Sequence, residues 1–337
     1  MTTRKELLLK NFPVAASYLL AALLIPIVLH FKLLPAVIAG LAVHVLTDKL
    51  AQHLPKHWTR VAREVALAVL VAIVMLLVLG AGFGVWSFLS GHGLAALLTV
   101  AAGTLERLRQ VLPADFAEAI PSTVEDLRLQ AATVLRAYGT EISVAGLEGV
   151  KLFAHILLGM VIGGMTSLHH FKGKDQWSPL AGALHLRTVS LTDAFEKIVF
   201  AQVTISLLNT ILTALFLLVV LPIFGVHLPM RAVLIVLTFL CGLLPVVGNL
   251  LSNVVIVLIS LGMSPGVGVA SLVFLVAIHK LEYFTNAKIV GGRVHATAWE
   301  LLCSMLLMEA VFGLGGLVAA PVVYAWIKSE LKAKEMI

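Results

Sequence analysis

Two carboxylates in apolar surroundings are the residues of this sequence best suited to chemistry inside a membrane. Glu309 lies shortly before Gly313 in a long apolar stretch, and Glu282 ends an earlier one. A charged carboxylate in hydrocarbon costs roughly 2.5–3.5 kcal/mol on insertion scales, so it normally faces a cavity or a partner and can bind a cation or exchange a proton there. Alternatively, Glu309 could lie at the membrane interface or pair with a lysine between subunits, and Glu282 could form a surface ion pair.

Breaks in two apolar segments could expose backbone groups to a bound molecule. Pro245 and Gly248 interrupt one segment, and Gly313 and Gly316 interrupt a second, which continues to Pro321. Because every backbone N–H and C=O in hydrocarbon needs a partner, a broken helix there lines a cavity or packs against protein. Unwound helices near the middle of the bilayer often form binding sites for ions and polar solutes. The alternative is close helix packing, which small residues also permit.

Neutral polar side chains accompany the first of these breaks. Gln202 and Asn209 lie in the apolar segment before it, and Asn249 and Asn253 follow it directly. These amides could hydrogen-bond a polar solute. Hydrogen bonding between helices is an equal alternative.

Other constellations give little support to a metal site or an enzyme. His44 and Asp48 lie one helical turn apart, but no third ligand follows at a suitable spacing. The sequence contains no His-Glu-x-x-His, no Gly-x-Ser-x-Gly and no phosphate-binding loop. We therefore expect no metal, no catalytic residues and no cofactor.

The composition is that of a membrane protein. Hydrophobic residues make up 60% of the 337 residues and charged residues 12%, against about 45–50% and about 25% in soluble domains. Several apolar runs exceed the ~18 residues needed to cross a bilayer, which predicts an all-α polytopic integral membrane protein with about six to eight membrane-crossing segments. Lys and Arg outnumber Asp and Glu by 24 to 18. In a membrane protein this excess is typical of cytoplasmic loops, so we expect no nucleic-acid partner.

The chain divides into three parts by its pattern. Residues 1–89 contain N-terminal membrane spans, the first too long for an ordinary signal peptide and so expected to be retained. Residues 90–149 have apolar residues at helical spacing between polar ones, which predicts amphipathic helices outside the cytoplasm. Residues 150–337 form the C-terminal core of membrane spans. Ser178-Pro179 opens an amphipathic cytoplasmic helix there, at about 178–197.

Loop charge predicts the orientation. The basic loop at 48–64 and the loop at 169–197 suit the cytoplasm, and the acidic middle region suits the outside. The protein is then a multi-pass protein of the cytoplasmic (inner) membrane with both termini in the cytoplasm. The segment at 232–262 could cross the membrane or form a re-entrant hairpin. The charges at 288–293 favour hairpins at 232–262 and 300–327 that enter from opposite faces.

Several motifs occur in a characteristic order in the C-terminal part. Gln202 opens the fifth span and is followed, in order, by Leu244-Pro245-Val-Val-Gly248, Glu282, Ile289-Val-Gly291, Phe312-Gly313-Leu-Gly-Gly316 and Ala320-Pro321. This ordered set resembles the autoinducer-2 exporter-like transporters. The resemblance covers about residues 200–337 by motif and the preceding residues mainly by layout.

The resemblance implies a secondary-active exporter of a small polar solute similar to autoinducer-2. Since no nucleotide motif is present, an ion or proton gradient would drive it. Some family members are associated with exchange of sodium or lithium for protons, so a cation/proton antiporter is the alternative, and a passive channel or an oligomeric membrane scaffold is a more distant one. The resemblance also implies a homo-oligomer, with a pentamer expected. Glu309 or Glu282 would bind or titrate the coupling ion, and the two breaks would form the substrate site and gate.

Overall fold

The computed structural model describes residues 4–55, 58, 61–90, 129, 133, 137, 139–169, 177–243, 247–294 and 297–336. The side chains of some helical residues, including those at 4–11 and 282–294, lie outside this description. Pro245 and most of the region predicted to be amphipathic, 90–149, therefore lie outside the described residues, as does the side chain of Glu282.

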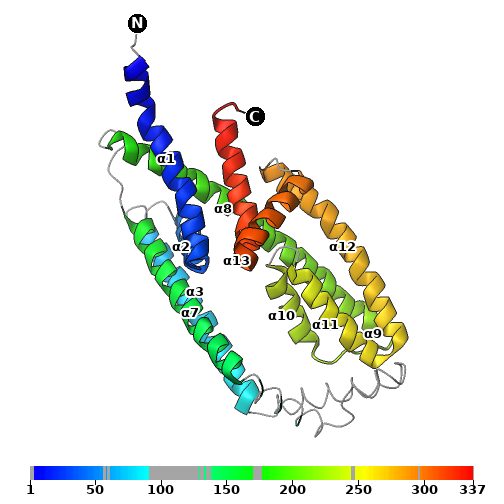
Figure 1. Ribbon diagram of the computed structural model, residues 1–337. Helices are drawn as coiled ribbons and strands as arrows, with labels where there is room; N and C mark the ends of the chain where they lie inside the picture. The colour runs from blue at the N-terminus through cyan, green and yellow to red at the C-terminus, as the bar shows by residue number, and fades with distance from the viewer. Residues whose placement is uncertain are drawn as a thin grey trace. The chain divides into compact units, whose positions relative to one another are not determined.

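The described part of the chain is helical and contains no strand. Its elements (Figure 1) are α1 (Arg4–His30), α2 (Leu34–His53), α3 (Ala62–Ser90), α7 (Gly139–Leu168), α8 (Pro179–Leu215), the π-helical turn η3 (Phe216–Val220), α9 (Leu221–Ile223), α10 (Arg231–Gly242), α11 (Val247–Met263), α12 (Pro265–Val294) and α13 (Ala298–Ala333).

Six of the described helices are long and apolar enough to cross a membrane. They are Phe12–His30, Leu34–His53, Ala62–Gly80, Gly146–Leu168, Pro179–Ile223 and Trp299–Ala333, the last counted by length and composition although it turns back in its middle. Large apolar side chains such as Leu19, Leu76 and Val161 are exposed on these helices, as hydrocarbon requires of a lipid-facing surface. These features confirm the predicted all-α polytopic membrane protein.

Helix α8 joins two elements that the sequence predicts separately. Ser178 begins it, because the Ala181 N–H donates to the Ser178 hydroxyl over 3.4 Å. The predicted amphipathic helix at 178–197 and the start of the fifth span then form one uninterrupted helix to Leu215. Polar residues in 178–197 make this part look like a separate amphipathic helix. No proline lies between it and the fifth span to end the helix.

The chain divides into two compact units, each with its own broken-helix hairpin. Unit 1 comprises residues 1–75, 149–199 and 290–337, and unit 2 comprises residues 76–148 and 200–289.

In unit 2, α10 and α11 form a helical hairpin. The two helices lie side by side (Figure 1). With 12 and 17 residues they are about 18 and 26 Å long, and the hydrocarbon core is about 30 Å thick. Buried apolar residues hold the hairpin to its neighbours, with Leu217, Leu234, Ile256 and Leu275 at the centre. The structure thus shows a helical hairpin at 232–262, and its re-entry into the membrane stays a prediction.

In unit 1, α13 reverses direction in its middle. Gly313 has φ 62° and ψ −149°, which no helix contains. The Lys328 Nζ atom lies 2.7 Å from a carboxylate oxygen of Glu300, although a straight helix would separate these two residues by about 42 Å. Residues before and after Gly313 are thus two arms of a hairpin (Figure 1), as predicted for 300–327. The prediction that the two hairpins enter from opposite faces stays a prediction.

Helices α2 and α7 in unit 1 approach until their backbones touch. A Cβ atom added at Gly159 would lie 2.0 Å from the Ala36 carbonyl oxygen, and one added at Gly163 would lie 2.1 Å from that of Gly40. Both helices thus carry small residues four positions apart, a spacing that permits close contact in membranes. This contact fixes two of the helices around a cavity described below.

Candidate functional site

The end of α10 is held by polar side chains from α8. The Gln202 amide donates to the carbonyl of Gly242 over 2.7 Å, and the Ser206 hydroxyl donates to the carbonyl of Phe239 over 2.7 Å. The last carbonyls of a helix have no partner within the helix. In an apolar environment such groups need a partner from elsewhere, and here α8 supplies it.

A pair of buried amides joins α8 to the start of α11. The Asn209 amide nitrogen donates to the side-chain oxygen of Asn249 over 3.1 Å. Both side chains are buried. A side-chain amide has two N–H donors and an acceptor oxygen with two lone pairs. The two asparagines can therefore hydrogen-bond a polar molecule in addition to each other. Asn253 lies one turn further along α11 and is partly buried.

Glycines allow the tip of this hairpin to close. A Cβ atom at Gly248 would lie 1.6 Å from the Cys241 carbonyl oxygen, and one at Gly242 would lie 2.6 Å from the Ser206 hydroxyl. The structure thus brings four predicted residues together at one hairpin tip: Gln202, Asn209, Gly248 and Asn249. Pro245, predicted with them, lies outside the described residues.

The α13 hairpin contains the second predicted group. Gly313 lies exposed at the turn, whereas Gly316 and Pro321 on the second arm are buried. A Cβ atom at Gly316 would lie 1.9 Å from the Met308 carbonyl oxygen on the first arm. A side chain there would push the arms apart, so Gly316 is required for close packing next to the turn.

Glu309 is exposed on the first arm, one turn before Gly313. No ion pair or hydrogen bond reaches its carboxylate from the side chains that the structure describes. Its predicted role in binding an ion stays a prediction. The same holds for Glu282, whose backbone belongs to α12.

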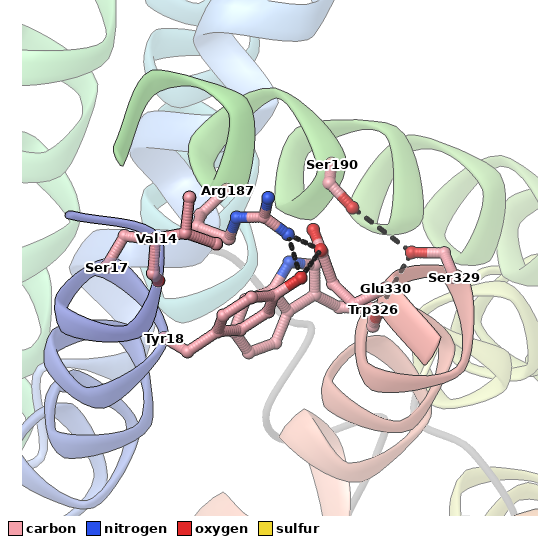
Figure 2. Close-up of polar contacts among 8 residues, drawn as sticks. All are labelled: Val14, Ser17, Tyr18, Arg187, Ser190, Trp326, Ser329 and Glu330. Atoms are coloured by element: carbon pink, nitrogen blue, oxygen red, sulfur yellow. Dashed lines mark hydrogen bonds and ion pairs between the residues drawn. The ribbon is translucent and has the colours of Figure 1, made fainter. Parts of the chain in front are cut away.

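A buried polar cluster in unit 1 joins three helices (Figure 2). Arg187 of α8 forms an ion pair with Glu330 of α13, and their side chains are only 12% and 8% exposed. The Tyr18 hydroxyl of α1 donates to Glu330 over 3.0 Å and accepts from Arg187 over 2.6 Å. The Arg187 guanidinium also lies 4.3 Å from the centre of the Tyr18 ring. We call Tyr18, Arg187 and Glu330 the polar joint.

Further contacts between α8 and α13 lie beside the polar joint, one between hydroxyls and the others apolar. The Ser190 and Ser329 hydroxyls lie 3.1 Å apart on the same two helices (Figure 2). Ala194 and Ile198 of α8 pack against Ala325 and Trp326 of α13. The second arm of α13 is therefore anchored to α1 and α8 at the end away from Gly313. The sequence gives no local signal for this cluster, because its members lie far apart in the chain.

The spanning helices, together with two hairpins whose breaks bring polar groups into apolar surroundings, define a multi-pass membrane protein with broken helices of the kind that build transport sites. Comparison with known proteins agrees. The chain belongs to the AI-2E family of transporters, since the model of the AI-2E family transporters matches residues 16–336. The resemblance drawn from the motifs is thereby confirmed.

One curated relative is similar to this chain. It is the "Putative transport protein YdbI" of Bacillus subtilis (strain 168), 27% identical over 205 residues. The match covers 58% of this chain and 55% of that protein, so it spans about half of the relative's length. No solved structure matches the chain.

Proposed function

We propose that this transporter is secondary-active and exports a small polar solute similar to autoinducer-2, using an ion or proton gradient. The observation that carries the proposal is the tip of the α10–α11 hairpin, where amides from α8 and α11 meet the carbonyl end of α10. These groups are neutral, and together they can both donate and accept hydrogen bonds. They suit hydroxyl and carbonyl groups better than a charged solute.

Binding at this tip would exchange hydrogen bonds within the protein for hydrogen bonds to the solute. The Asn209–Asn249 bond and the Gln202–Gly242 bond both satisfy groups that the solute can satisfy in their place. The exchange costs little, since a buried polar group is paired before and after it. An apolar molecule of the same size would leave these groups unpaired, so the tip selects polar solutes.

The α13 hairpin is proposed as the gate and as the position of the coupling ion. Its turn depends on a glycine conformation at Gly313, and its far end is anchored by the polar joint. Glu309 lies one turn before Gly313, where a carboxylate could bind a cation or a proton. Glu282 is the second candidate for that role. The exposed Glu309 also supports the alternative of a sodium or lithium antiporter, which would need the carboxylate but not the amides.

We further propose a homo-oligomer, with a pentamer expected, in the cytoplasmic membrane with both termini in the cytoplasm. The exposed charge of Glu309 on an apolar arm supports an oligomer, because hydrocarbon alone would leave the carboxylate unpaired. The excess of Lys and Arg in the loops at 48–64 and 169–197 supports this orientation.

The substrate site is tested by uptake of radiolabelled autoinducer-2 into inverted membrane vesicles with an imposed proton gradient. The Gln202→Leu variant removes the donor to Gly242. Thr204→Val is its control, because Thr204 is exposed on the same helix and, among the described residues, its hydroxyl donates only to the carbonyl of Phe200 on that helix. We expect uptake in the native protein and the control, and a loss of about tenfold or more in Gln202→Leu. Equal uptake in both variants would exclude the hairpin tip as the site.

A further inference from the structure

A cavity of about 780 Å³ lies inside unit 1, where α2, α7 and the first half of α8 meet. Cavities that bind small organic molecules are about 300–1,000 Å³ in volume. Among the described residues that line it, none belongs to α10, α11 or α13. The cavity therefore shares no described lining residue with either hairpin or with the site proposed above.

Most of the cavity wall is apolar. Val28, Leu41, Leu158 and Ile162 line it, together with the glycines of the α2–α7 contact. These glycines bring the two backbones together and leave no side chains that would fill the space beside them. An apolar body would therefore find a preformed surface here.

One end of the cavity is charged and mostly acidic. Asp48 and Lys49 come from the end of α2, and Asp193 and Glu196 come from α8. Arg63 lies 3.1 Å from Asp48. These five residues carry three carboxylates and two cationic groups, so this end has a net charge of −1.

Asp193 differs from the other two carboxylates at this end. Asp48 is paired with Arg63, and Glu196 is paired with Lys49 over 2.6 Å. Among the residues that the structure describes, no hydrogen bond or ion pair reaches Asp193. One negative charge beside an apolar cavity thus has no internal partner.

We propose that this cavity binds an amphipathic organic cation, with its apolar body along α2 and α7 and its positive group beside Asp193. An organic anion would be repelled by Asp193, because no described side chain neutralises that carboxylate. A metal ion is disfavoured, because the described His, Cys, Asp and Glu side chains form no group of three that could hold one. The binding of such a cation does not depend on the transport function proposed above.

The test is equilibrium binding to the purified full-length protein in nanodiscs of zwitterionic lipid. The probe is radiolabelled tetraphenylphosphonium, and tetraphenylborate is an anion of nearly the same size and shape. His44, His155 and His185 also line the cavity, so every binding measurement is made at the same pH. We expect saturable binding of the cation and much weaker binding of the anion.

Three variants locate the probe. Asp193→Asn removes the unpaired charge, and we expect it to weaken binding of the cation about tenfold, the effect of one lost charge contact. Leu41→Trp fills the apolar part, and we expect it to abolish binding. Glu64→Gln removes a carboxylate from α3 that does not line the cavity, and we expect native binding. Because Asp193 is exposed at the edge of the cavity, Asp193→Asn should fold normally, as gel filtration would check.

Four results would overturn the proposal. The first is binding of the cation that does not saturate, and the second is an anion that binds as tightly, since the charge would then have no role. The third is unchanged binding in both Asp193→Asn and Leu41→Trp, which would mean that the probe enters the lipid. Finally, native mass spectrometry could find the cavity occupied by co-purified lipid that the cation does not displace.

Discussion

At the scale of single residues, buried polar contacts hold together helices from distant parts of the sequence. The amide pair Asn209–Asn249 joins α8 to α11, and the ion pair Arg187–Glu330 joins α8 to α13. Taking two charges out of water costs several kcal/mol per ion, and only good geometry with further hydrogen bonds repays it. Tyr18 supplies such bonds at the polar joint.

Removal of one partner from the polar joint should destabilise the protein strongly. Glu330→Ala would leave the Arg187 charge buried without its carboxylate, so we expect a loss of about 3–5 kcal/mol in the free energy of unfolding. Lys332→Ala on the same arm removes an exposed charge and should cost less than about 1 kcal/mol. Chemical denaturation in detergent micelles measures both.

A double variant separates charge from packing at this joint. With Arg187→Met and Glu330→Met together, no unpaired charge remains, and we expect most of the lost stability to return. If Glu330→Ala alone were no less stable than Lys332→Ala, the ion pair would not anchor the second arm of α13.

At the scale of elements, the two hairpins depend on glycines for different reasons. Gly248 and Gly316 lie where the two arms touch, so a side chain would collide with the backbone of the opposite arm. Gly313 meets no neighbour within 4 Å, but its φ of 62° with ψ of −149° is accessible almost only to glycine. Gly313 is thus needed at the turn for its backbone conformation, and Gly316 is needed beside the turn for its small size.

A matched pair of glycines separates these two reasons. Gly313→Ala should destabilise the protein by about 1–3 kcal/mol through backbone strain alone. Gly315 also has open space around its Cβ position but lies in helical conformation. Gly315→Ala should therefore be neutral or should stabilise by up to about 1 kcal/mol. Thermal unfolding in detergent compares the two, and equal effects would show that the turn does not need glycine at 313.

Both hairpins could be predicted from the sequence, but the contacts that anchor them could not. The breaks carry local signals, since Pro and Gly interrupt apolar runs at Pro245, Gly248 and Gly313. The small residues Gly159 and Gly163 also have a recognisable spacing on α7, although the neighbouring sequence does not indicate that α2 packs against them. Arg187 and Glu330 resemble ordinary charges near helix ends, because pairing across distant segments leaves no periodicity in the chain.

At the scale of the whole molecule, the chain combines a lipid-facing apolar surface with a few polar clusters inside each unit. Spanning helices expose leucine, valine and isoleucine. Among the described residues, three polar clusters are the tip of the α10–α11 hairpin, the polar joint and the charged end of the cavity. Only the first of these combines neutral hydrogen-bonding groups with a broken helix, which is why we propose it as the solute site.

Coupling between solute and proton tests the central claim most directly. Sealed inverted vesicles carry this protein and a pH-sensitive dye, and autoinducer-2 is added without any other gradient. We expect a change of internal pH in the native protein and its loss in Glu309→Gln, because the carboxylate is proposed to carry the proton. A pH change evoked by sodium or lithium but never by the solute would contradict solute export and establish the antiporter instead.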